Sequence, residues 1–150
     1  MRVALEARGR PAPPLPRLED WAERLAALVE DLRMQPFAWG VQDCVTVAAD
    51  GVQAVTGADP HLARGAYATE AEAAAILAAH GGLEGYVAAM MAAFGAAECL
   101  PAFAQRGDPV LVEVGNELLC GTVAGEAVAV PGLDRLRFVP AARIRRAWAV

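Results

Sequence analysis

The chain changes character near residue 105, and this change limits its fold more than any other feature. Before it, apolar residues recur at helical spacing; after it, short apolar runs alternate with glycine-containing turns. The first pattern predicts helices at about 18–32, 43–56, 69–80 and 83–94. The second predicts strands at 109–114, 117–124, 126–130 and in the tail RIRRAWAV. Helices followed by strands indicate an α+β fold, with N-terminal helices packed on a C-terminal antiparallel sheet.

The helix signals are local. Asp20 and Arg24 form an i,i+4 pair on the polar side of the first helix. The segment 43–56 is apolar nearly all round and stops at Gly57, as a buried helix with a glycine cap would. The third helix opens with the capping box Thr69-Glu-Ala-Glu72. The third and fourth helices are expected to be packing elements.

The length of 150 residues predicts a single domain, and no internal repeat is present. Residues 1–16 contain four of the ten prolines and predict an extended, polyproline-like arm. This arm is either a mobile lead-in or a ligand for a partner's groove. We therefore divide the chain into an arm, 1–16, and one domain, 17–150.

Composition excludes several classes of function. The net charge of −5 argues against nucleic-acid binding. Three cysteines without metal-ligand spacing predict no metal site, no cofactor and no disulfide framework, which suits a reducing compartment. Neither the start of the chain nor the interrupted apolar region 71–97 has the pattern of a signal peptide or a membrane span. We expect the protein to be made in the cytoplasm.

Charge is uneven along the chain. Residues 135–150 hold five arginines and no acidic residue. This basic end is either a solvated edge or a surface for an acidic partner.

Cys44 is the candidate nucleophile, because it stands at the expected start of the helix 43–56. Unpaired backbone N–H groups at a helix N-terminus favour a thiolate, and a nearby histidine usually completes its activation. The chain has only two histidines, His61 in a loop and His80 at a helix end. The simpler interpretations are a buried structural cysteine and two exposed histidines.

The stretch FAWGVQDC resembles the nucleophile motif of NlpC-type cell-wall peptidases, which have a papain-like fold. Trp39, Gly40 and Asp43 are the motif residues before Cys44. RGDPVLVEV resembles the next landmark of that family, where a Gly-Asp turn, here Gly107-Asp108, leads into the first strand of the sheet. The tripeptide 106–108 is therefore expected to be a turn and not an adhesion signal.

The chain departs from this family at the catalytic base, a histidine in a His-x-Gly motif on the second strand. Aligning the glycine of that motif with Gly121 in LLCGTVAG puts Leu119 where the histidine belongs. Leucine cannot accept a proton, and a general base contributes about 10²–10⁴-fold to the rate. Cys99 and Cys120 are expected to be small apolar fillers.

The order of the landmarks is closer still to a branch of that clan found in tailed phages, prophages and gene-transfer-agent-like clusters, beside tail genes. This resemblance implies a non-catalytic tail or tail-tip component, or an assembly factor, that binds other tail proteins and is carried in the virion. The second hypothesis is an active cysteine hydrolase, a peptidoglycan endopeptidase or amidase, in which His80 or His61 serves Cys44 as base. The third is a module that binds a small molecule or peptide in the retained cleft.

Overall fold

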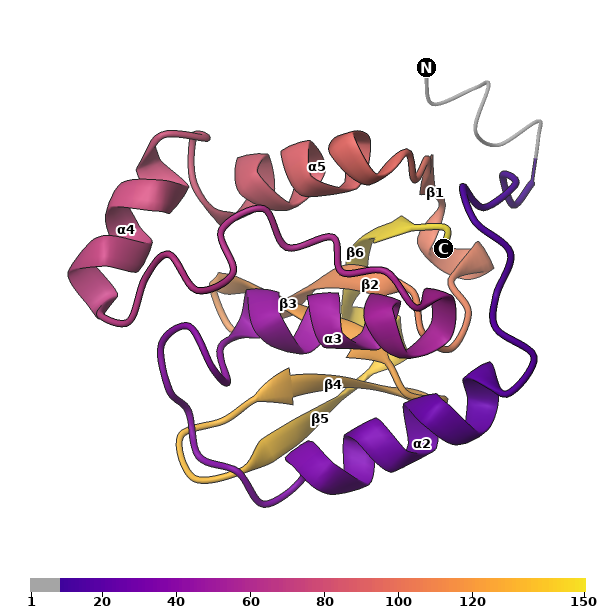
Figure 1. Ribbon diagram of the computed structural model, residues 1–150, viewed down its shortest axis with the longest axis horizontal. Coiled ribbons are helices and arrows are strands. Elements are labelled where there is room, and N and C mark those ends of the chain that lie inside the picture. Colours follow the sequence, from indigo (N-terminus) through magenta and orange to yellow (C-terminus); the bar gives the residue numbers. More distant parts are fainter. Residues whose placement is uncertain (1–8) are drawn as a thin grey trace.

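The computed structural model describes residues 9–150 and has the predicted α+β organisation (Figure 1). Four α-helices occupy the first two thirds of this part of the chain: α2 (Trp21–Leu32), α3 (Cys44–Thr56), α4 (Glu70–Ala78) and α5 (Leu83–Phe94). Six strands follow: β1 (Glu98–Cys99), β2 (Pro109–Val114), β3 (Glu117–Val123), β4 (Ala127–Pro131), β5 (Leu136–Pro140) and β6 (Ile144–Trp148). Two short 3₁₀ turns, Pro101–Phe103 and Ala141–Arg143, lie beside β1 and β6.

The strands form one sheet in the order β1-β6-β2-β3-β4-β5, and every pairing is antiparallel. The β2, β3, β4 and β6 strands were expected from the sequence, whereas β1 and β5 were not. β1 has only two residues. β5 lies at an edge, and its exposed Arg137 and Phe138 interrupt the alternation that marks a half-buried strand.

The first core lies between the helices and one face of the sheet. Helix α3 is at its centre, with nine buried residues. Figure 1 shows α3 running across the sheet, with α2 and α5 on either side of it. α5 contributes Tyr86, Val87, Met90 and Met91, all at most 1% exposed. The Met90-Met91 pair is therefore core, as an apolar helix in this position predicts.

A second core lies on the opposite face of the sheet and is built from strand residues. Val110 and Val112 of β2 pack there with Val128 and Val130 of β4, and all four are fully buried. No α-helix among residues 9–150 contributes to this cluster. Ala104 and Ala141, the latter in the 3₁₀ turn before β6, pack against it, so short segments outside the α-helices help to cover this face of the sheet.

The N-terminal segment is not a free lead-in where the structure describes it. The Arg10 guanidinium contacts the Asp108 carboxylate with both terminal nitrogens, and Arg17 lies 3.3 Å from the same carboxylate. Both arginines also donate to the Val150 carbonyl oxygen. Arg10 and Arg17 thus hold the proline-rich segment between them against the domain. Residues 1–8 of the predicted arm lie outside the described residues.

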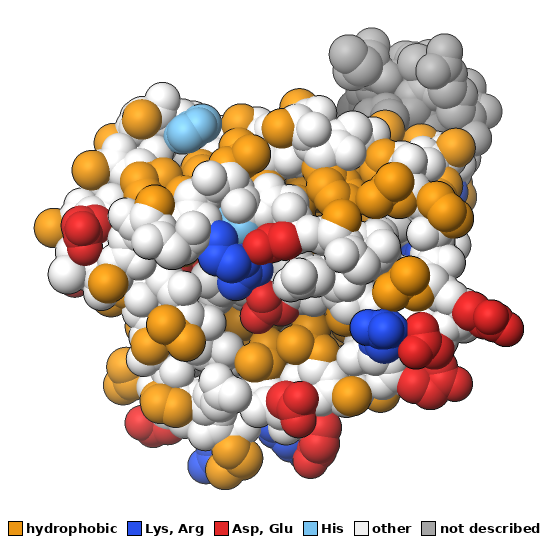
Figure 2. Space-filling view, in the orientation of Figure 1, with side chains coloured by type: hydrophobic (Ala, Val, Ile, Leu, Met, Phe, Trp, Pro, Cys, Tyr) orange, Lys and Arg blue, Asp and Glu red, His pale blue; other side chains and the backbone are white. Residues whose placement is uncertain are grey.

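Charged side chains on the face shown in Figure 2 form small mixed groups of both signs. In β6, Arg145 is paired with Glu113, and Arg146 with Glu84 and Glu98. These two arginines of the basic C-terminal end are thus already neutralised within the chain. Within residues 9–150 no single helix has the length and apolar character to cross a membrane, although α4 and α5 together, bent by 69°, pass that test by length and composition.

Candidate functional site

Asp43 sets the start of α3 and so the position of Cys44. The Asp43 backbone is extended, its Oδ1 accepts the Thr46 N–H at 2.9 Å, and its own N–H donates to Thr46 Oγ1 at 2.8 Å. This reciprocal capping box makes Cys44 the first helical residue. Asp43 therefore caps α3, and the prediction that Cys44 stands at the start of this helix is confirmed.

The loop before α3 is held against the segment that contains Tyr67. Gly40 has a φ of +80°, and its N–H donates to Asp43 Oδ2 at 2.8 Å. A Cβ at this position would lie 2.2 Å from the Tyr67 carbonyl oxygen, so only glycine fits here. Trp39 packs edge to face against Phe37, with ring centroids 4.7 Å apart. Trp39 thus forms a wall beside Cys44.

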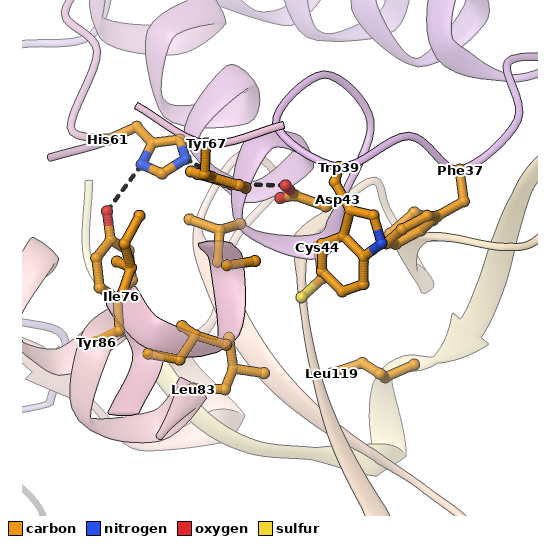
Figure 3. Close-up of a pocket in the computed structure, with 14 residues that line it drawn as sticks. Phe37, Trp39, Asp43, Cys44, His61, Tyr67, Ile76, Leu83, Tyr86 and Leu119 are labelled. Carbon is orange, nitrogen blue, oxygen red and sulfur yellow. Dashed lines mark hydrogen bonds between the residues drawn. The ribbon is translucent and has the colours of Figure 1, made fainter. Parts of the chain in front are cut away.

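These elements line a partly open cavity of about 180 Å³ in front of the α3 N-terminus. Figure 3 shows the Cys44 sulfur pointing into it, with Trp39 beside it and Ile76 and Leu83 across from it. The complete lining comprises Phe37, Trp39, Asp43, Cys44, Val45, His61, Tyr67, Ala73, Ile76, Leu77, Leu83, Tyr86, Leu119 and Pro131. Most of these side chains are apolar or aromatic, so the cavity presents little hydrogen-bonding capacity.

A chain of hydrogen bonds crosses one wall of the cavity (Figure 3). The Tyr67 hydroxyl donates to Asp43 Oδ2 at 2.6 Å, His61 Nε2 lies 3.1 Å from the Tyr67 hydroxyl, and His61 Nδ1 lies 2.9 Å from the Tyr86 hydroxyl. Because the proton of Tyr67 goes to Asp43, the Tyr67 oxygen must accept from His61 Nε2–H. Nδ1 then accepts from Tyr86 and from the Ala63 N–H. The geometry therefore assigns His61 as a neutral imidazole protonated on Nε2.

His61 is 8% exposed, which corrects the simpler expectation of an exposed loop histidine. Burial lowers its pKa, and the nearby positive charge of Arg64 lowers it further. Arg64 also bonds to Asp59 and, at 2.8 Å, to Asp50 of α3, which fastens the loop carrying His61 to that helix. Burial likewise raises the pKa of Tyr67, and its hydrogen bond to Asp43 adds to this.

The Cys44 thiol is not activated in this arrangement. Burial raises its pKa to about 11, and the negative charge of Asp43 acts in the same direction. Hydrogen bonding from the backbone of Cys120 and of the first turn of α3 opposes these effects without outweighing them. At neutral pH, Cys44 is therefore a thiol, and the favourable influence of the helix N-terminus does not decide its charge.

Neither histidine forms a pair with Cys44. Both ring nitrogens of His61 are engaged by tyrosine hydroxyls. His80 is exposed, does not line the cavity, and donates through Nδ1 to the Ile76 carbonyl oxygen at 3.0 Å. His80 is thus the exposed helix-end residue that the simpler interpretation describes.

Strand β3 presents no base to the cavity. Leu119 lines the cavity, but it is paired with Val112 and packs with the second core, on the sheet face away from α3. Its neighbour Cys120 is paired with Leu111 and is fully buried in the first core, beside Cys44. Cys120 and the buried Cys99 are fillers, as expected.

Gly107 and Asp108 form the expected turn into β2, outside the cavity. Gly107 has a φ of +90°, and a Cβ there would lie 2.7 Å from Val55 of α3. Asp108 is fully buried and accepts from the backbone N–H groups of Gln105 and Val150 as well as from the two arginines of the N-terminal segment. The role of this motif is structural.

Tyr67 and Tyr86 were not identified from the sequence. The chain contains only two tyrosines and two histidines, and both tyrosines bond to His61. The rarity of these residue types was the one signal in the sequence that could have pointed to the two tyrosines. Among residues 9–150 no group of three or more His, Cys, Asp and Glu side chains is placed to hold a metal ion.

A family model described as a domain of unknown function, DUF6950, matches residues 16–150. This range includes every described helix and strand and the whole lining of the cavity. No curated protein and no solved structure shows a significant match to the chain.

Proposed function

The chain belongs to the DUF6950 family, and we propose that it is a non-catalytic domain of NlpC-type, papain-like architecture that serves as a structural or assembly protein of a phage or prophage tail. The architectural part is supported by the order of the landmarks. A cysteine heads a buried helix that packs on an antiparallel sheet, and a Gly-Asp turn leads into the β2 strand of that sheet. This is the order in which the resembling peptidases arrange the same features.

Within residues 9–150 no free base lies beside Cys44, and this observation carries the non-catalytic part. Both nitrogens of His61 are occupied by tyrosines, and β3 contributes a leucine and a buried thiol to this region. A thiol with a pKa of about 11 and no general base is a poor nucleophile at neutral pH.

The tail assignment rests on the resemblance of the motif series, from FAWGVQDC to RAWAV, to proteins encoded beside tail genes. Partner proteins of the tail would bind the outer surface of the domain. The paired Arg145 and Arg146 and the packed residues 10–16 make the basic C-terminal strand and the proline-rich segment weaker candidates for that interface than the sequence suggested. We expect the protein to be made in the cytoplasm and then carried in the tail.

An active cysteine hydrolase is the alternative, and one observation favours it: Cys44 and His61 line the same cavity. Catalysis would require His61 to leave at least one tyrosine and reach Cys44, and the thiol to lose its proton in an apolar environment. Both steps work against the hydrogen bonds and the burial described above.

Site-resolved alkylation tests the non-catalytic proposal. We expect Cys44 to react with iodoacetamide only as the pH approaches about 11, and His61→Ala to leave the reaction at neutral pH unchanged. Mass spectrometry reads the three cysteines separately, with the buried Cys99 and Cys120 as internal controls. Clearing of purified peptidoglycan that Cys44→Ser abolishes would establish the hydrolase instead.

The tail role has its own test in the phage or prophage that encodes the chain. We expect the protein in purified particles by mass spectrometry, and defective tails when its gene is deleted. Complementation with Cys44→Ser is the matched control, because a structural role does not need the thiol and tails should be restored. Normal, infectious particles without the protein would contradict the proposal.

A further inference from the structure

We propose that the cavity in front of Cys44 is a binding site for an uncharged, apolar group about the size of one aromatic ring. This inference rests on the proposed absence of catalysis at Cys44 and is independent of the tail assignment. It deepens the proposed function by assigning a ligand chemistry to the retained cleft.

The size of the cavity sets the size of the ligand. Its volume is about 180 Å³. Apolar protein cavities of about 150 Å³ stay free of water and accept benzene. The space therefore suits a benzene or indole ring, or a branched aliphatic side chain, and not an extended polar substrate.

The lining sets the polarity of the ligand. Ile76, Leu77 and Leu83 form an aliphatic side, and Phe37 and Trp39 supply aromatic surface. Rings in such a setting gain from edge-to-face and offset contacts in addition to the burial of apolar area.

The four hydrogen-bonding side chains along one wall of the cavity already satisfy one another. Asp43, Tyr67, His61 and Tyr86 form a continuous hydrogen-bonded chain. Two buried side-chain atoms in residues 9–150 lack a partner, Gln42 Oε1 and Thr122 Oγ1, and neither residue lines the cavity. A polar ligand would have to break existing bonds to form its own with this wall, so an uncharged apolar ligand is favoured.

Charge leads to the same conclusion. The Cys44 thiol is uncharged at neutral pH, and none of the arginines in residues 9–150 lines the cavity. The carboxylate of Asp43 is the negative group of the wall. An anionic ring compound would therefore lose its hydration without gaining a cation partner.

The chain contains only two isoleucines, which allows a direct measurement of location. Ile76 lines the cavity, whereas Ile144 is buried in the second core on the other face of the sheet. With both δ1 methyl groups ¹³C-labelled, titration with toluene or indole should shift the Ile76 signal in a saturable way and leave the Ile144 signal in place. Benzoate should bind at least tenfold more weakly than toluene.

Two alanines of α4 provide a matched pair of variants. Ala73 is buried and lines the cavity, and Ala74 is exposed on the same helix. Ala73→Leu should fill part of the space and weaken binding at least tenfold, whereas Ala74→Leu should bind as the wild type does. If Ala73→Leu does not fold, the wild-type Ile76 titration still decides the question.

Capped amino acids distinguish the two sources of such a group. Binding of N-acetyl-tryptophanamide or N-acetyl-leucinamide at least as tightly as indole would identify the side chain of a partner protein. Binding of the free rings alone would identify a small molecule.

No saturable shift of Ile76 with any uncharged probe, or equal binding to the wild type and a folded Ala73→Leu, would overturn the proposal. That failure is separate from failure of the proposed function, because Cys44 alkylation is read on the unliganded protein. If Cys44 is unreactive and no probe binds, only the proposed ligand site is refuted. If Cys44 is reactive and the protein clears peptidoglycan, the non-catalytic assignment is refuted.

Discussion

Asp108 joins three parts of the chain that are far apart in sequence. It contacts Arg10 and Arg17 of the N-terminal segment and the backbone N–H of Val150, and it begins the entry into β2. Its side chain is fully buried, so its charge is compensated by these contacts and not by water. The Gly107-Asp108 turn, which resembles a landmark of the peptidase family, thus attaches the N-terminal segment to the domain.

Replacement of this carboxylate should be strongly destabilising. Asp108→Asn leaves two partly buried arginines without their counter-ion, and breaking a buried ion pair costs about 3–5 kcal/mol. Asp20→Asn is the matched control, because Asp20 also pairs with an arginine but lies 58% exposed at the side chain, and it should change stability by less than about 0.5 kcal/mol. Equilibrium unfolding in urea measures both. Similar small losses in the two variants would show that the Asp108 network contributes little.

At the scale of single elements, α3 shows how local and non-local signals combine. Its ends were predictable, since Asp43 caps the N-terminus and Gly57 adopts a φ of +82° at the C-terminus. Its interior contains Gly51, a poor helix former, for a tertiary reason. A Cβ on Gly51 would lie 2.3 Å from Thr122 Oγ1 of β3, so glycine permits the close approach of helix and sheet.

Gly51→Ala should therefore destabilise the protein, although alanine is favoured over glycine by about 1 kcal/mol in an exposed helix. We expect a loss of about 1–3 kcal/mol from overpacking against Thr122. Gln53→Ala, two residues along on the exposed side of α3, should stay within about 0.5 kcal/mol of the wild type. Thermal or urea unfolding compares the two. A Gly51→Ala protein more stable than the wild type would show that the helix–sheet contact is loose.

At the scale of the whole molecule, the chain from Asp43 through Tyr67 and His61 to Tyr86 connects the start of α3, the loop 58–68 and α5. The fold keeps the buried His61 imidazole neutral, because Nε2–H donates to the Tyr67 hydroxyl and Nδ1 accepts from the Tyr86 hydroxyl. The pKa of His61 is lowered by burial and by Arg64, against smaller opposing effects of Asp43 and Asp59.

This lowered pKa makes stability depend on pH with a definite sign. In the unfolded state His61 takes up a proton near pH 6.5, whereas in the folded state it does so only at lower pH. The stability that depends on a neutral His61 is therefore fully present above pH 6.5 and is lost as the pH falls. Each unit by which folding lowers this pKa corresponds to about 1.4 kcal/mol in the free energy of unfolding.

We expect the free energy of unfolding to fall between pH 7.5 and pH 5, and to fall less steeply in His61→Gln. His80→Gln, at the exposed histidine, is the matched control for the loss of a histidine. Urea unfolding at a series of pH values measures this. Identical slopes in the wild type and His61→Gln would refute the assignment of His61 as a buried neutral imidazole.

The sequence by itself determined the fold class, the four helices and most of the sheet, because capping residues, glycine stops and hydrophobic periodicity act over a few residues. It also determined that Cys44 heads a helix, through Asp43. Tertiary structure alone decided the state of the site. Three features depend mainly on contacts between residues far apart in the chain: the desolvation of Cys44, the tyrosine partners of His61, and the side of β3 that faces α3. Examples are the contacts of Asp43 with Tyr67 and of His61 with Tyr86. Desolvation and hydrogen-bond partners set a pKa, and both come from packing that no local pattern encodes.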